Sequence, residues 1–239
     1  MRVLAGTSGF SYDEWKGTFY PEKLPGSRML GYYAERLPAV EINNTFYRMP
    51  GANVLDSWAG QVPEQFRFAV KASRRITHIK RLKDAAEETA YFIDRVDRLG
   101  EKLGATLFQL PPYFRKDRER LASFLALLPE RAPAAIEFRH ASWFEDDVLD
   151  TLRDHNVALC IADADEGDEA TPVATASWGY LRLRRAAYGE RELDAWLEKA
   201  RALRWEHAYA FFKHEDAGAG PELAARFMSR AASKASTGG

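Results

Sequence analysis

Residues 136–142 read IEFRHAS, and this stretch decides the fold prediction. With the two alanines before it, the stretch begins as an apolar run that can be buried on both faces of a parallel sheet. It then carries Glu137, Arg139 and His140 in close succession, and these groups cannot all be buried without partners. The stretch therefore predicts a buried strand whose far end contributes to a site.

Apolar runs that end in a charged or amide residue recur along the chain, with helical spacing of apolar residues between them. Predicted strands cover residues 1–8, 39–43, 66–71, 105–110, 136–142, 157–162, 178–183 and 207–212. Predicted helices cover or lie within 27–37, 54–61, 84–99, 121–128, 148–152 and 193–200, and a last helix begins at Pro221. Eight strands alternating with helices predict a single (β/α)8 TIM-type barrel, with an open doubly wound sheet as the alternative.

The size and composition predict one domain over residues 1–232, followed by a small, polar and flexible tail over 233–239. A net charge of -1 argues against a generally basic nucleic-acid coat. The single cysteine, Cys160, excludes an intramolecular disulfide and is interpreted as a small buried apolar residue. No run is apolar enough to span a membrane and the first residues lack a signal-peptide pattern, so we expect a cytoplasmic protein with no membrane partner.

If the strands close into a barrel, their carboxyl ends meet at one rim, where such barrels hold their chemistry. Three carboxylates are predicted there as catalytic groups: Glu137, Glu41 and Asp163. The same rim is expected to hold substrate through Asn43, Lys71, Gln109, Arg139, Arg182, Lys213 and His214. Arg184 also belongs to this set of strand-end residues. The alternative is that these charges are buried ion pairs that only close the top of the barrel.

Aromatic residues follow several of the predicted strands. Trp15, Tyr47 and Trp143 are predicted to bind substrate by stacking, and the alternative is that such rings plug the barrel mouth. No metal ligand is assigned, because HExxH, HxH and clustered histidine spacings are missing from the sequence. The cofactor is also left open, since GTSGFSY after the first strand matches neither GxGxxG nor GxxxxGK[ST].

Five motifs follow one another along the chain: GTSGFSYDEWKGTFYP, VEINNTFYRMP, FAVKASRRITH, LFQLPP and IEFRHASW. In this order they resemble the YecE-like family, also called domain of unknown function 72. The resemblance implies a (β/α)8 barrel, with a pocket at the carboxyl end of the strands lined by Glu41, Asn43, Lys71, Gln109, Glu137 and Arg139. It also places Asp163 at the acidic end of the sixth strand.

The last third of the chain departs from this family pattern. Residues 182–185 read RLRR where many members read RLHG, and residues 211–216 read FFKHED in place of an asparagine-rich strand end. Substrate contacts on that side are therefore expected to differ. The resemblance supports the assignment of Lys213 and His214 to the site less than it supports that of Glu137.

Three functions remain open from the sequence. The first is an enzyme that acts by acid/base chemistry on a small anionic substrate, such as a phosphorylated sugar or a nucleotide. The second is a nucleic-acid-binding barrel that uses the basic residues between Lys71 and Lys83. A metal-dependent phosphodiesterase is one form of this second function. The third is a non-catalytic protein that binds a ligand without changing it.

Overall fold

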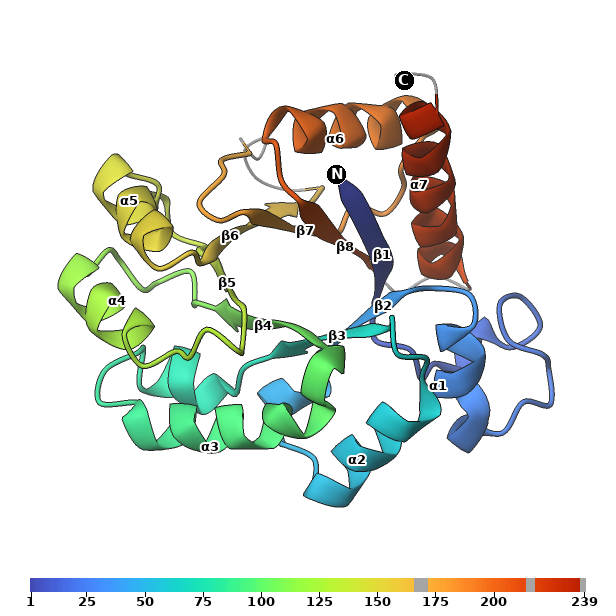
Figure 1. Ribbon diagram of the computed structural model, residues 1–239, viewed down its shortest axis with the longest axis horizontal. Coiled ribbons are helices and arrows are strands. Elements are labelled where there is room, and N and C mark those ends of the chain that lie inside the picture. Colours follow the sequence, from blue (N-terminus) through green and yellow to red (C-terminus); the bar gives the residue numbers. More distant parts are fainter. Residues whose placement is uncertain (166–171, 214–217, 237–239) are drawn as a thin grey trace.

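The computed structural model is a closed barrel of parallel strands, in the order β1 to β8, surrounded by helices (Figure 1). It describes residues 1–165, 172–213 and 218–236. The strands are β1 (Arg2–Ser8), β2 (Ala39–Ile42), β3 (Arg67–Lys71), β4 (Leu103–Gln109), β5 (Ala134–Glu137), β6 (Ala158–Asp163), β7 (Trp178–Leu183) and β8 (His207–Phe212). The predicted TIM-type barrel is confirmed, and the doubly wound sheet is excluded because β1 pairs with β8.

The helices that follow the strands lie outside the barrel (Figure 1). They are α1 (Gly26–Ala34), α2 (Ala52–Gln61), α3 (Ala86–Val96), α4 (Arg118–Leu125), α5 (Asp146–Asp154), α6 (Glu190–Ala202) and α7 (Ala219–Ser236). Strand β5 ends at Glu137, so the rest of the IEFRHAS stretch forms a loop and a short 3-10 helix, Ala141–Trp143. The strand is therefore shorter at this end than the sequence predicted.

Two further segments differ from the sequence-based prediction. The basic stretch after β3 was predicted as a loop, but it contains a π-helical turn, Arg75–Ile79, with Ile76 and Thr77 buried. Helix α7 continues to Ser236, so it includes the first residues of the predicted tail, and residues 237–239 lie outside the described part of the chain.

The inside of the barrel is filled unevenly. Strands β7 and β8 contribute the large side chains Trp178, Tyr180, Tyr209 and Phe211 to the inner core. Strands β2, β3, β5 and β6 contribute small residues, mainly alanines, to the same core. Because close-packed interiors leave little free space, the large rings of one wall fill the volume that the small residues of the other wall leave.

The outer core joins the strands to the surrounding helices. Rings contact one another edge to face from α3 through β4 to α4, where the centroid of Phe108 lies 5.9 Å from that of Phe92 and 5.1 Å from that of Phe124. The amphipathic helices bury one stripe each, such as Val148, Leu149 and Leu152 in α5. This packing fixes the position of each strand end.

Among the described residues, no helix is long and apolar enough to cross a membrane.

Gly6 in β1 lies against the backbone of β2. A Cβ atom at Gly6 would stand 1.8 Å from the carbonyl oxygen of Ala39. We therefore expect Gly6→Ala to lower the free energy of unfolding by about 3 kcal/mol in urea denaturation, since neither backbone can move without breaking the barrel.

Gly60 in α2 provides the control, because a Cβ there would meet no atom within 4 Å. We expect Gly60→Ala to raise the free energy of unfolding by about 0.5 kcal/mol, the usual gain for alanine in a helix. Equal effects of the two substitutions would show that β1 and β2 are not held at this spacing.

Candidate functional site at the carboxyl ends of the strands

Arg182, from β7, joins two buried glutamates across the barrel. Its Nη2 donates to Glu41 Oε1 at 2.9 Å, and its Nη1 donates to Glu137 Oε2 at 2.7 Å. All three side chains are at most 2% exposed. The arrangement is possible because residues two apart in a strand face the same way, so that the inner face of β7 carries Tyr180 directly below Arg182.

Each glutamate also accepts hydrogen bonds from its neighbours. Glu41 receives the hydroxyl groups of Ser8 at 2.9 Å and Tyr180 at 2.8 Å, and the amide of Asn43 at 2.8 Å. On the other side, Glu137 Oε1 receives Gln109 Nε2 at 2.8 Å and Arg139 Nε at 3.0 Å. Nearly every acceptor position of the two carboxylates is thus occupied.

These contacts decide the charge of both carboxylates. Burial alone raises the pKa of a carboxyl group, but Arg182 and the hydrogen-bond donors more than offset this effect for both glutamates. The pKa of Glu41 is lowered, and that of Glu137 falls to about 2 because Arg182 and Arg139 both lie beside it. Both are therefore ionised at neutral pH, and neither accepts a proton readily.

Lys71, at the end of β3, holds its proton less firmly than an ordinary lysine. Its Nζ donates to Gln109 Oε1 at 2.9 Å and lies 4.2 Å from the centre of the Phe46 ring. Burial, followed by the charge of Arg182, lowers the pKa of Lys71 to about 8. Lys71 is therefore a titratable group at this end of the barrel with a pKa suited to proton transfer near neutral pH.

Positive charge exceeds negative charge at this mouth. Arg139 and Lys71 flank Glu137, and Arg184 lies two residues beyond Arg182 on the same side of β7. The side chain of Arg184 is half-buried and forms no ion pair with the described residues, and burial together with Arg182 lowers its pKa. The two glutamates thus face four cations, which favours the binding of an anion.

Two buried polar atoms of this cluster lack a hydrogen-bond partner among the described residues. They are Nε of Arg182 and Oδ1 of Asn43. An unpartnered buried polar group costs about 1–3 kcal/mol, so a partner supplied by a ligand would be favourable.

Exposed apolar side chains stand on four consecutive loops at the same end of the barrel. Tyr47 follows β2, Ile79 follows β3, Tyr113 follows β4 and Phe144 follows β5, and each is more than half exposed. Since β2 to β5 are neighbours in the barrel, these loops lie along one half of the mouth. Such a surface suits a ligand with an apolar or flat part.

Asp163 does not belong to this cluster, although it was predicted with the catalytic carboxylates. It lies on the outer face of β6, where it accepts hydrogen bonds from Arg185, Tyr188 and Trp196. The reason is the alternation of the strand, since Cys160 faces the inner core and a residue three positions later faces outward. Through these hydrogen bonds Asp163 holds helix α6 and the loop after β7 against the barrel.

The predicted aromatic residues are placed differently from one another. Trp15 is fully buried among Tyr12, Phe19 and Tyr20. Trp143 is equally buried, stacked 4.7 Å from Phe138, with its Nε1 donating to the carbonyl oxygen of Phe114. Both therefore support loops and are out of reach of a ligand.

Tyr47, in contrast, is 75% exposed and packs edge-on against Phe46, the ring below Lys71. It lies at the mouth as predicted from the sequence, and its role in binding stays a prediction.

The strand-eight residues stay predictions as well. Lys213 follows β8 directly and is half-buried, and its backbone NH donates to the carbonyl oxygen of Leu183. His214 lies outside the described residues.

Other residues of the site were not singled out from the sequence. Ser8 and Tyr180 bind Glu41, and His78 packs edge-on 4.9 Å from Phe46 beside Lys71. The signal for Tyr180 was available, because it lies two residues before Arg182 and hence on the same face of the strand. His78 had no such signal, since its position depends on the π-helical turn.

Within residues 1–165, 172–213 and 218–236, no group of three or more His, Cys, Asp or Glu residues is placed to hold a metal ion. The predicted substrate residues Asn43, Lys71, Gln109, Arg139 and Arg182 are brought together with Glu41 and Glu137. The convergence of distant residues at one mouth is therefore observed, with Asp163 as the exception.

The family described as "Protein of unknown function DUF72" matches residues 4–237. The chain belongs to this family. It is 33% identical over 135 residues to UPF0759 protein YunF of Bacillus subtilis, which covers 53% of this chain and 48% of that protein. It is 31% identical over 120 residues to UPF0759 protein YecE of Escherichia coli, covering 50% of this chain and 44% of that protein. The chain thus matches about half the length of these curated relatives.

Solved structures of the DUF72 family share the fold. A DUF72 family protein from Thermotoga maritima superposes with a TM-score of 0.82 at 30% identity, covering 96% of this chain and 99% of that one. A DUF72 family protein from Enterococcus faecalis gives a TM-score of 0.80 at 21% identity, covering 96% of this chain and 95% of that one. The resemblance stated from five sequence motifs is confirmed, and the family assignment identifies a barrel without assigning it an activity.

The bridge made by Arg182 yields a stability prediction. We expect Arg182→Met to lower the free energy of unfolding by about 3–5 kcal/mol, because Glu41 and Glu137 would be left as buried charges without their shared partner. Urea denaturation at neutral pH measures this loss.

Arg131→Met is the matched control, since Arg131 pairs with Asp97 but is 64% exposed. A surface pair contributes little, so a change within about 0.5 kcal/mol is expected. If Arg182→Met were no more harmful than Arg131→Met, the two glutamates would have to be neutral in the folded protein.

Proposed function

We propose that this DUF72 protein is an enzyme that binds a small anionic substrate at the mouth of the barrel and uses Lys71 for proton transfer. The observation that carries the proposal is the position of the Lys71 amine, which lies between Gln109 and the Phe46 ring with a pKa lowered to about 8. A lysine with this pKa has about one-tenth of its amine in the neutral form at pH 7 and returns the proton easily.

The remaining charged groups suit the binding of an anion. Arg139 is 43% exposed and Arg184 is half-buried, so both are placed to reach a ligand in the mouth. A guanidinium presents several N–H donors in a plane, which matches the oxygens of a phosphate or a carboxylate. The exposed rings of Tyr47 and Phe144 offer surface for a larger, flatter part of the substrate.

The two glutamates serve a different role in this proposal from the one predicted from the sequence. Glu137 accepts hydrogen bonds from Gln109, Arg139 and Arg182, and its low pKa makes it a weak base. It holds the cations and the glutamine in position, and Glu41 does the same for Asn43 and Arg182. Proton transfer is assigned to Lys71, because only a group with a pKa near the working pH both takes up and releases a proton readily.

Nucleic-acid binding through the basic residues after β3 receives less support. Arg75 and Lys80 both pair with Glu88 of α3, at 3.1 Å and 2.7 Å. Part of the positive charge that the sequence suggested is therefore neutralised within the fold, and phosphate contacts would have to break these pairs.

Sulfate is the probe for anion binding, since it keeps the same charge from pH 6 to 10. We expect Arg139→Met and Arg184→Met each to weaken sulfate binding about tenfold in calorimetric titration, the value of one charge-assisted hydrogen bond. Arg204→Met is the control, because Arg204 is exposed in the loop before β8 at the other end of the barrel. Equal affinities of all four proteins would place the anion elsewhere.

The pH dependence of sulfate binding tests the role of Lys71. The pKa of Lys71 is lowered to about 8, so the ammonium form predominates below pH 8 and the neutral amine predominates above it. We expect affinity to be constant below this pH and to fall above it, with a midpoint near 8. Lys71→Met should bind sulfate weakly and without this midpoint. A wild-type affinity that is flat from pH 6 to 10 would remove Lys71 from the site.

A further inference from the structure

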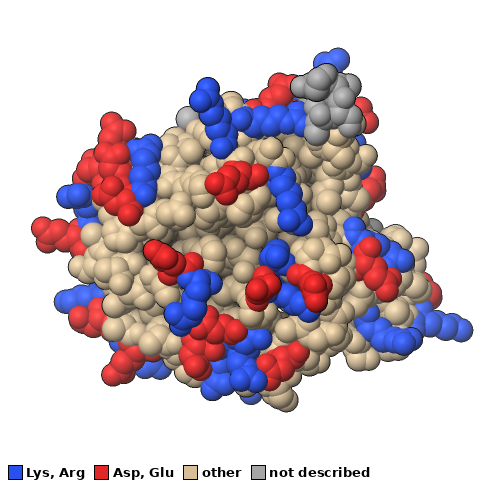
Figure 2. Space-filling view, in the orientation of Figure 1, with Lys and Arg blue, Asp and Glu red and all other residues tan. Residues whose placement is uncertain are grey.

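A second cavity lies at the opposite end of the barrel, among the amino-terminal ends of β5 to β8. Its volume is about 710 Å³. The view of Figures 1 and 2 is onto this end, and Figure 2 shows a hollow in the middle of the face that is mostly uncharged, with charged side chains around it. The proposed anion site is at the far end of the strands, so this cavity is a separate feature.

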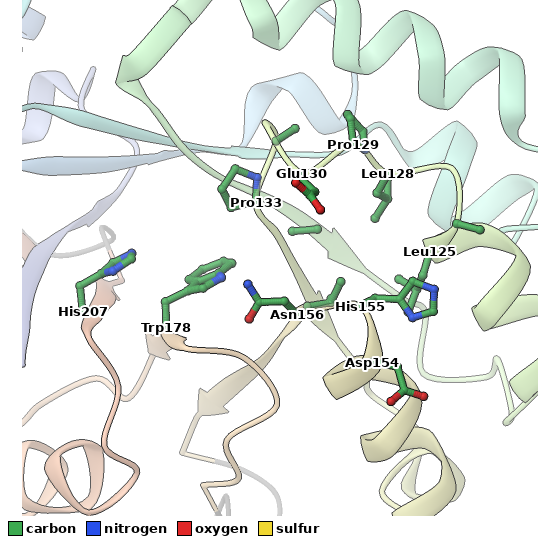
Figure 3. Close-up of a pocket in the computed structure, with 14 residues that line it drawn as sticks. Leu125, Leu128, Pro129, Glu130, Pro133, Asp154, His155, Asn156, Trp178 and His207 are labelled. Atoms are coloured by element: carbon green, nitrogen blue, oxygen red, sulfur yellow. The ribbon is translucent and has the colours of Figure 1, made fainter.

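One wall of the cavity is aromatic and the other is aliphatic. The rings of Trp178 and His207 stack with centroids 6.1 Å apart and planes 8° from parallel. Leu125 and Leu128 (Figure 3) line the other side of the space, together with Val157. A flat apolar group that lies against the aromatic wall would lose its contact with water on that face, which favours binding.

The indole of Trp178 supplies a polar contact that the protein itself does not use. Trp178 is only 4% exposed, and its Nε1 donates no hydrogen bond to any described residue. In Figure 3 this nitrogen points toward the interior of the cavity, on the side of Asn156. This nitrogen is not among the buried polar atoms that lack a partner, so its N–H is open to the cavity, and a ligand that displaces water there has to offer it a hydrogen-bond acceptor.

The charges that line the cavity are negative. Glu130, which points into the space in Figure 3, and Asp154 are its acidic residues, and none of the described Lys or Arg residues lines it. Burial lowers the pKa of His207, so its ring is neutral at pH 7 and adds no positive charge. Arg2 and Arg67 influence His207 from β1 and β3 but do not line the cavity. A cation is therefore the complementary ligand charge.

We propose that this cavity binds a small organic cation that combines an aromatic ring, an amine and a hydrogen-bond acceptor. The ring rests on the Trp178 wall, the acceptor receives the N–H of Trp178, and the amine faces Glu130, while Asp154 adds negative charge at the edge of the cavity. The volume suits a molecule of this size, since ligand cavities commonly measure about 300–1,000 Å³. An amine without a ring would leave the aromatic wall without a contact. A ring without an amine would leave the acidic residues without a partner.

Tyramine is the probe, and calorimetric titration of the full chain is the measurement. Tyrosol has the same ring and hydroxyl but no charge, and phenethylamine has the amine but no hydroxyl. We expect saturable binding of one tyramine per chain, with each of the two analogues binding about fivefold more weakly, because each lacks one polar contact. The variant Trp178→Phe keeps a ring and removes the N–H, and it should bind tyramine and phenethylamine equally.

The acidic residues are tested by the double substitution Glu130→Gln, Asp154→Asn, which should weaken tyramine binding about tenfold. Glu119→Gln, on the exposed side of α4, should leave it unchanged. Lys71→Met should also leave it unchanged, which separates this inference from the proposed anion site. The inference is overturned if tyramine shows no saturable binding up to about 10 mM, if tyrosol binds as tightly, or if Lys71→Met abolishes binding.

Discussion

The constraint on which the structure depends is the pair of buried carboxylates held by one guanidinium. Glu41 and Glu137 come from strands on different sides of the barrel, and Arg182 reaches both with separate nitrogens. Each isolated charge would cost several kcal/mol in this environment, so the three groups are stable only when all are present and correctly spaced. The barrel must therefore close with β2, β5 and β7 in this register for the mouth to form.

This shared ion pair also decides which groups are available for chemistry. Since the carboxylates are saturated with donors, they act as fixed negative supports for the cations around them. The cations in turn affect Lys71, because Arg182 and burial together favour its neutral form. Burial, followed by the charge of Arg182, thus lowers the pKa of this strongly basic side chain to about 8. The opposite end of the barrel has a different character, with an aromatic wall and acidic residues around a separate cavity.

Much of the site was predictable because the sequence pattern indicates where each strand ends. Glu41, Lys71, Gln109 and Glu137 each close an apolar run, and parallel strands in a barrel bring such residues to one rim. Asp163 closes a run as well, but a shift of one position in a strand reverses the side to which a residue points. The sequence shows that Asp163 ends a strand, whereas only its contacts with Tyr188 and Trp196 show that it faces outward.

The sequence by itself determined the order of strands and helices, the closed barrel and the identity of most residues at its carboxyl end. These features depend on periodicity and on which residue types follow each apolar run, and both are local properties of the chain. Tertiary contacts decided that one arginine binds two glutamates, that the pKa of Lys71 is lowered to about 8 and that Trp15 and Trp143 are buried. Those facts depend on distances between residues far apart in the chain and on burial, which exist only after the strands have closed around a common core.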